Sequence, residues 1–196
     1  MTQATSTLTS GFDALIPTDW KLKREGNYWQ VSEPAAGNNL FEISGGLSVA
    51  FSLDKPGNTF PFFTSALTGI CQVNDALVVA QVNGKAYVAA VEMKTSPGAK
   101  GDALKQIESG HLFIQWAAQL LRHHGHCAND YTFFGIVSLK PRNQPRKGTS
   151  RRCAELPAPE PSPHGSSYPV FVLVNHPRIS IADVVRKLDE RHTSPG

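Results

Sequence analysis

The sequence lacks the long apolar runs of membrane proteins and the leader of secreted ones. No stretch approaches the roughly 20 apolar residues that a membrane-spanning helix requires. Residues 1–17 contain no cationic region followed by an apolar block, so we expect no secretory signal there. Cysteine is also scarce: Cys71, Cys127 and Cys153 are odd in number and show no CxxC spacing, which disfavours a disulfide framework. These absences predict a soluble, cytoplasmic protein with no membrane partner.

Several common catalytic signatures are absent as well. The chain contains no glycine-rich phosphate loop, no GxSxG nucleophile elbow, no HExxH zinc motif and no internal repeat. Little therefore supports an α/β enzyme of one of those types. The net charge of +3 is only mildly basic. Such a charge is compatible with a polyanionic partner but does not require one.

Length and pattern predict one globular domain of the α/β class. A chain of 196 residues, 40% hydrophobic and 18% charged, is long enough to bury a core. Apolar runs predict strands at 46–54, 76–82, 86–93, 131–139 and 169–174. Apolar residues at three- and four-residue steps predict a long helix with Asp102 as its N-cap, ending near His124-Gly125, and a second helix over 179–192. This order indicates a mixed β-sheet with a central hairpin, flanked by helices.

The remaining segments carry weaker signals. Residues 1–39 form an N-terminal segment of uncertain structure, in which aromatic residues alternate with charges and Gly, Pro and Asn breaks. We expect residues 40–196 to form the domain. Within it, residues 140–168 are rich in Pro, Ser and Arg, a composition typical of a flexible loop.

Acidic and basic side chains stand at one end of the predicted hairpin. Asp75 precedes the run 76–82, and Glu92 and Lys94 end the next run. Asn83-Gly84, between the two runs, is a typical two-residue hairpin turn. Pairing around that turn brings Asp75 close to Glu92, with Lys94 on the same face because strand side chains alternate. Two carboxylates and a lysine so placed can hold Mg²⁺ or Mn²⁺ for phosphodiester hydrolysis, which requires an activated water and charge stabilisation.

This arrangement resembles the active site of the PD-(D/E)xK nuclease superfamily, and residues 40–140 resemble its restriction endonuclease-like core. The resemblance implies that Asp75, Glu92 and the backbone carbonyl of Met93 are metal ligands. It also implies that Lys94 is the catalytic lysine, which holds or deprotonates the attacking water. The chain departs from the motif at Asn74, where the motif name has a proline that is often missing in the superfamily. The expected activity is that of a Mg-dependent endo- or exodeoxyribonuclease acting on DNA.

The resemblance implies further features outside the hairpin. A glutamine on the helix after the ExK motif is common in some members, and Gln106 fits that place, where it would orient a metal-bound water or Lys94. Some members add a glutamate from an earlier element, for which Glu42 is the first candidate and Glu33 the second. Many such nucleases act as dimers, so we expect a homodimer or a subunit of a larger complex.

Basic residues gather after the strand 131–139. The segment 140–152 holds six of the 19 lysines and arginines, namely Lys140, Arg142, Arg146, Lys147, Arg151 and Arg152. An arm of this composition can contact phosphates without base specificity, and a solvated loop is the alternative. We expect Arg146, Lys147, Arg151 and Arg152 to contact nucleic acid.

Two other interpretations stay open. A short pattern such as Asp followed by ExK also arises by chance, so the alternative function is an inactive nuclease-fold module that binds nucleic acid or a protein partner. The cluster His123, His124, His126 and Cys127 suggests zinc, but consecutive residues after a helix break point in different directions. Histidine is also favoured at helix C-termini, so a helix-end role is the expected one.

Overall fold

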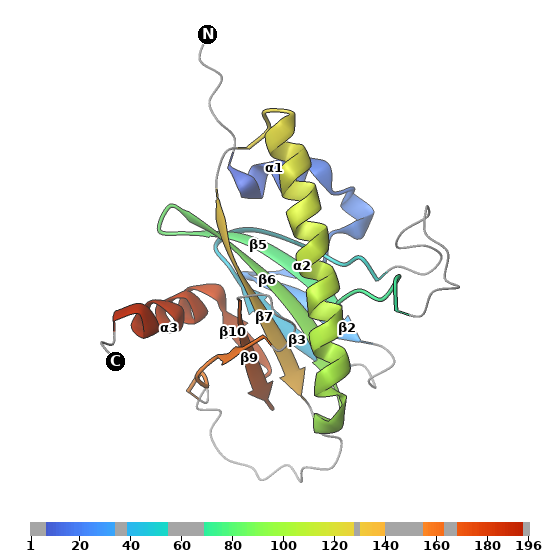
Figure 1. Ribbon diagram of the computed structural model, residues 1–196, viewed down its shortest axis with the longest axis vertical. Coiled ribbons are helices and arrows are strands. Elements are labelled where there is room, and N and C mark those ends of the chain that lie inside the picture. The colour runs from blue at the N-terminus through green and yellow to red at the C-terminus, as the bar shows by residue number, and fades with distance from the viewer. Residues whose placement is uncertain are drawn as a thin grey trace.

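The computed structural model describes residues 7–33, 39–54, 69–127, 130–139, 155–162 and 168–193. Their elements, in chain order, are α1 (Leu8–Leu15), the 3₁₀ turn η1 (Thr18–Trp20), β1 (Arg24–Glu25), β2 (Tyr28–Glu33), β3 (Asn39–Ser44), β4 (Leu47–Phe51), β5 (Ala76–Val82), β6 (Lys85–Lys94), the 3₁₀ turn η3 (Pro97–Ala99), α2 (Lys100–His123), β7 (Tyr131–Leu139), β8 (Glu160–Pro161), β9 (Pro169–Val174), β10 (Arg178–Ser180) and α3 (Ile181–Thr193). Figure 1 shows their arrangement.

Two mixed β-sheets organise the chain, which is of the α/β class. The larger sheet has the strand order β4-β5-β6-β7-β9-β8, and the smaller has the order β1-β2-β3-β10. In the larger sheet β4, β5 and β6 are antiparallel, and β7 and β9 then run parallel to β6. Because parallel neighbours need a crossover, the long helix α2 connects β6 to β7 (Figure 1).

Both faces of the larger sheet are covered, which explains why its central strands are almost wholly apolar. On one face, Leu77 and Val79 of β5 pack with residues of α1 and α2. On the other, Val78 and Ala80 pack with the smaller sheet and α3. Strand residues alternate between faces, and continuous apolar runs are typical of strands buried on both sides. The position of a side chain along β5 or β6 therefore decides which layer it meets.

The hairpin of β5 and β6 is closed by the expected turn. Asn83 and Gly84 adopt positive φ values of 49° and 78°, as a two-residue hairpin turn requires at both positions. Pairing runs from Val82 opposite Lys85 to Ala76 opposite Val91 without interruption. The predicted strand 76–82 is confirmed at both ends, and the strand predicted over 86–93 extends by one residue at each end.

Several sequence-based boundaries are corrected. The strand predicted over 46–54 spans only Leu47–Phe51. Asp102 is not the N-cap of α2, because the 3₁₀ turn at Pro97–Ala99 runs into a helix that already begins at Lys100. The last helix begins at Ile181 rather than 179, because Arg178–Ser180 pair with β3. The loop over 140–168 includes a two-residue strand, β8, paired with β9.

The N-terminal segment contributes to the same core as the rest of the chain. Phe12 of α1 is fully buried and stacks on Phe51 of β4, with ring centroids 6.0 Å apart. In the smaller sheet, β2 and β3 pair from Tyr28 opposite Ser44 to Glu33 opposite Asn39.

None of the described helices is long and apolar enough to cross a membrane.

We expect Phe12→Ala to destabilise the protein strongly and Leu15→Ala to have little effect. Phe12 is buried against Phe51, and removing a buried phenylalanine side chain costs about 3–5 kcal/mol. Leu15 lies on the same helix and is 44% exposed, so its truncation should stay within about 0.5 kcal/mol. Urea denaturation measures both free energies of unfolding. Equal effects would show that α1 does not pack as described.

Candidate active site

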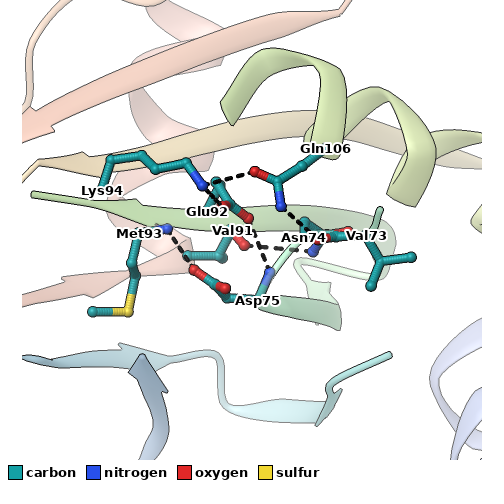
Figure 2. Close-up of polar contacts among 8 residues, drawn as sticks. All are labelled: Val73, Asn74, Asp75, Val91, Glu92, Met93, Lys94 and Gln106. Atoms are coloured by element: carbon teal, nitrogen blue, oxygen red, sulfur yellow. Dashed lines mark hydrogen bonds and ion pairs between the residues drawn. The ribbon is translucent and has the colours of Figure 1, made fainter. Parts of the chain in front are cut away.

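Polar groups of four residues lie where β5 begins, β6 ends and α2 makes its first turns. The side chain of Lys94 contacts those of Glu92 and Gln106, and the backbone amide of Asp75 bonds to Glu92 (Figure 2). Glu92 and Lys94 have the same parity as Ala90, so both lie on the face covered by α2. The hairpin thus brings Asp75 next to Glu92, as the sequence predicts.

The two carboxylates are buried, and each accepts a hydrogen bond from a different backbone amide. Asp75 and Glu92 occupy the next positions outward from the Ala76–Val91 pair, with 8% and 1% of their surfaces exposed. The amide N–H of Asp75 donates to Glu92 Oε2 at 3.1 Å. The amide N–H of Met93 donates to Asp75 Oδ2 at 2.6 Å. The carboxylates are thus held against the ends of the two strands by the backbone itself.

Lys94 supplies a positive charge to this pair. Its ammonium forms an ion pair with Glu92 Oε1 and donates a hydrogen bond to Gln106 Oε1 at 2.7 Å. The Lys94 side chain is 22% exposed, so the ammonium lies between the buried carboxylates and solvent. Figure 2 shows Lys94 reaching back along β6 and Gln106 descending from α2 to meet it. Of the two contacts expected for Gln106, the structure contains the one to Lys94.

Gln106 also links the helix to the chain entering β5. Its side-chain Nε2 donates to the carbonyl oxygen of Val73 at 3.1 Å. One amide therefore accepts from Lys94 and donates to the backbone two residues before Asp75. This double contact fixes the orientation of the Gln106 amide and joins three segments of the chain at the site.

The remaining predicted residues lie elsewhere. Glu42 is on β3 in the smaller sheet, where its carboxylate is 3.6 Å from Arg178 of β10. Glu33 has its side chain outside the described residues, as do Arg146, Lys147, Arg151 and Arg152. Met93 is buried with its side chain among the residues that face the smaller sheet. Its backbone, by contrast, is at the site through the bond to Asp75.

The donor set is chemically suited to a hard divalent cation. Two carboxylates and one ammonium leave the three charged side chains with a net negative charge, which a bound cation would offset. Oxygen ligands are those that Mg²⁺ prefers, and Mg²⁺ binds through one or two carboxylates and retains waters. The residue types present fit Mg²⁺ or Mn²⁺, and Asp75 and Glu92 are the side chains that would hold it.

A cluster of three or more His, Cys, Asp or Glu side chains able to hold a metal does not occur within the described ranges. A site of two carboxylates and a backbone carbonyl falls below that size. At the end of α2, the rings of His123 and His124 lie edge to face with centroids 4.9 Å apart, and Cys127 is buried. Burial raises the pKa of the Cys127 thiol, and the nearby Arg122 lowers it to a smaller extent.

Asn74 is the residue whose importance sequence reasoning missed. It was noted only as a departure from the proline of the motif, yet it is 1% exposed. Its amide Nδ2 donates to the carbonyl oxygens of Ala76 and, at 3.5 Å, Val91. The only signal in the sequence is indirect: Gly110, in the middle of a helix, indicates a close approach by another part of the chain.

A second polar cluster lies further along α2. Tyr168 donates a hydrogen bond from its hydroxyl to Glu108 Oε2 at 2.7 Å, and the His111 ring stacks on Phe133 with centroids 4.2 Å apart. Burial raises the pKa of Tyr168, and the bond to Glu108 adds to the increase. Burial lowers the pKa of His111, although the nearby Glu108 acts in the opposite direction.

Comparison of the chain with models of known protein families, with curated proteins and with solved structures found no match. The resemblance to a nuclease superfamily thus depends on the residues of the hairpin and helix and on their geometry.

We expect His111 to make the protein less stable as the pH falls below about 6.5. The unfolded His111 titrates near 6.5, whereas burial lowers the pKa of the folded residue. Below pH 6.5 the unfolded state therefore binds a proton that the folded state does not, and the free energy of unfolding falls by at most about 1.4 kcal/mol per pH unit. This loss continues until the pH passes the folded pKa.

The measurement is urea denaturation at several pH values between 5 and 8 for the wild type and His111→Phe. The variant retains a ring to stack on Phe133 but has no titrating group. Its stability should therefore fall less steeply below pH 6.5. An identical pH dependence in both proteins would contradict the assignment.

Proposed function

We propose that this protein is a nuclease that hydrolyses phosphodiester bonds with Mg²⁺ or Mn²⁺, of the PD-(D/E)xK type. The observation that carries the proposal is that Asp75, Glu92 and Lys94 lie together at the end of a buried hairpin. Burying two carboxylates beside one another is costly. A pair retained at such a cost is more readily explained by chemistry than by stability.

The topology supports the same proposal for the fold. An antiparallel hairpin carries the acids, a helix follows it directly and packs behind it, and the next strand adds parallel to the second strand of the hairpin. This is the order that the resemblance to a restriction endonuclease-like core implies for residues 40–140. The smaller sheet and α3 would be additions to that core.

Each residue has a role in the proposed reaction. Asp75 and Glu92 hold the cation, to which the Met93 carbonyl is the expected further ligand. The cation supplies an acidified water and neutralises charge on the phosphate. Lys94 lies against Glu92, where its ammonium can orient a water at the carboxylates; only the neutral amine, after losing a proton, could accept one from that water. Gln106 accepts a hydrogen bond from Lys94 and so restricts where the ammonium can lie.

DNA is the proposed substrate, and the basic segment 140–152 supports a polyanionic one. That segment directly follows Leu139, the last residue of β7, and Leu139 pairs in register with Lys94. Parallel strands end at the same edge of a sheet, so Leu139, the residue before the basic segment, lies beside Lys94. Its positive charge would bind backbone phosphates without reading the base sequence.

One observation favours a second function, that of an inactive module that binds nucleic acid or a protein partner. The Lys94 ammonium already lies against Glu92 Oε1. In an inactive descendant such an ion pair would take the place of the cation and keep the hairpin end neutralised. The two functions differ in whether the acids bind a divalent cation.

We expect the purified protein to cleave DNA in the presence of Mg²⁺ or Mn²⁺, the variants Asp75→Asn and Glu92→Gln to be inactive, and Lys94→Met to be strongly impaired. The first two should also lose Mn²⁺ binding in calorimetry because each removes a charged ligand. Lys94→Met should retain the metal and lower kcat by about 10²–10⁴-fold, the usual contribution of a proton-transfer group. Plasmid, linear duplex and single-stranded DNA are tested beside RNA to name the substrate.

Lys85→Met is the matched control, since Lys85 is exposed at the opposite end of the same strand. It should keep wild-type activity. Absence of cleavage with every substrate, together with absence of Mn²⁺ binding, would reject the enzyme and favour the binding module. Cleavage by Lys94→Met at the wild-type rate would reject only the role of the lysine.

We expect the double variant Arg151→Ala/Arg152→Ala to bind DNA more weakly and with a flatter dependence on salt. Each phosphate contact contributes about 0.9 to the slope of log K against log salt, so losing two should reduce that slope by about 1.8. Fluorescence anisotropy with a labelled duplex between 50 and 200 mM salt measures it. An unchanged slope would show that these arginines do not contact phosphates.

A further inference from the structure

Asn74 lies at the point where β5 and β6 separate. Its side chain is buried, and its amide Nδ2 donates both to Ala76 in β5 and to Val91 in β6. The amide thus spans the two strands beside the pair formed by Asp75 and Glu92. Figure 2 shows the Asn74 side chain directed at Val91. The hydrogen bonds of its Nδ2 are thus with the backbone that frames the site.

The other end of the Asn74 amide faces Gly110 of α2. A Cβ atom built on Gly110 would lie 2.0 Å from Asn74 Oδ1 and 3.0 Å from Asn74 Cγ. Among the described residues, Asn74 Oδ1 is buried without a hydrogen-bond partner. Glycine is disfavoured in the middle of a helix, so helix formation does not explain Gly110. The absence of a side chain there instead makes the space that the Asn74 amide fills.

Val73 and Asn74, which are neighbours in the chain, therefore contact two positions on one face of α2. Gln106 and Gly110 are four residues apart and lie one above the other on the helix. Gln106 bonds to the carbonyl oxygen of Val73, and Gly110 receives the side chain of Asn74. The position of α2 relative to the strands is set at both points. With α2 so placed, Gln106 Oε1 lies 2.7 Å from the Lys94 ammonium.

We propose that Asn74 is a positioning residue: seated against Gly110, it sets the separation between α2 and the hairpin at which Gln106 holds Lys94. The contacts of Asn74 with Gly110 and of Gln106 with Lys94 exist whether or not the protein is an enzyme. Its importance for catalysis rests on the proposed function. A side chain at Gly110 would move α2 away from the strands, and Gln106 would then lose Lys94, Val73 or both.

The test measures how firmly Lys94 is held rather than whether the protein cuts DNA. Folded protein is treated with a small amount of an acetylating ester, and the rate at each lysine is followed by mass spectrometry. Lys85 and Lys105 are exposed and serve as internal references. Gly110→Ala and Asn74→Ala are compared with Gly101→Ala, a glycine of the same helix whose added Cβ would meet nothing within 4 Å.

We expect Gly110→Ala and Asn74→Ala to raise the acetylation rate of Lys94 about tenfold relative to Lys85, as Gln106→Met does. This is the change that corresponds to losing one hydrogen bond to a charged group. Gly101→Ala should leave the rate unchanged. Adding Gln106→Met to Gly110→Ala should produce no further increase, because the contact is already lost. If Gly110→Ala acted through a defect elsewhere in the fold, Gln106→Met would still raise the acetylation rate of Lys94 in its presence.

The proposal is overturned if Lys94 in folded Gly110→Ala reacts as in Gly101→Ala, or if the effects of Gly110→Ala and Gln106→Met multiply. Asn74→Ala introduces no clash and decides the matter alone if Gly110→Ala does not fold. A wild-type rate at Lys94 in Asn74→Ala would then reject the role of Asn74. None of these outcomes requires cleavage, so failure of the proposed function is recognised separately, by the absence of Mn²⁺ binding and DNA cleavage in the wild type.

Discussion

The register between β5 and β6 is the constraint on which the candidate site depends. It is set at the Asn83-Gly84 turn, whose positive φ values few other residue pairs adopt without strain. From that turn each pair follows from the last, so that Asp75 and Glu92 come to lie at the next positions after Ala76 and Val91. A slip of one residue would move one carboxylate to the opposite face of the sheet. The geometry of the acids is therefore encoded well away from them.

The same register places two carboxylates in a buried environment, where an ionised group without partners is unfavourable. Burying an ionised group costs several kcal/mol unless hydrogen bonds and charge partners compensate. Here two backbone amides and the Lys94 ammonium provide that compensation. An apolar pair of similar volume would serve stability as well or better. The arrangement is therefore more readily explained by a requirement for the acids than by their contribution to stability.

Local patterns predicted the parts of this structure that depend on neighbouring residues. The strands at 76–82, 131–139 and 169–174 were predicted with their observed ends, since each is an apolar run bounded by turn or loop residues. The proximity of Asp75 to Glu92, and the common face of Glu92 and Lys94, follow from hairpin pairing and strand alternation. The place of Gln106 was implied by the family resemblance.

Long-range pairing was not predictable in the same way. The three-residue strand β10 exists because it pairs with β3, well over 100 residues earlier, and nothing in its own sequence marks it. The segment before residue 40 was uncertain for the same reason, since β2 is recognised by its partner β3 and by Phe41 and Ile43 in the shared core. The contact of Asn74 with Gly110 depends on a missing side chain, which becomes meaningful only when the facing residue is known.

A polyanionic substrate would also depend on the charges near the candidate site. The acids and Lys94 together are negative and would repel a phosphate, so a polyanionic substrate requires positive charge nearby. Lys94 and Leu139 end adjacent parallel strands, which are about 4.8 Å apart, and the basic segment begins at the next residue. Under the proposed function, phosphate affinity and chemistry would come from separate segments of the chain, the first from 140–152 and the second from the ends of β5 and β6.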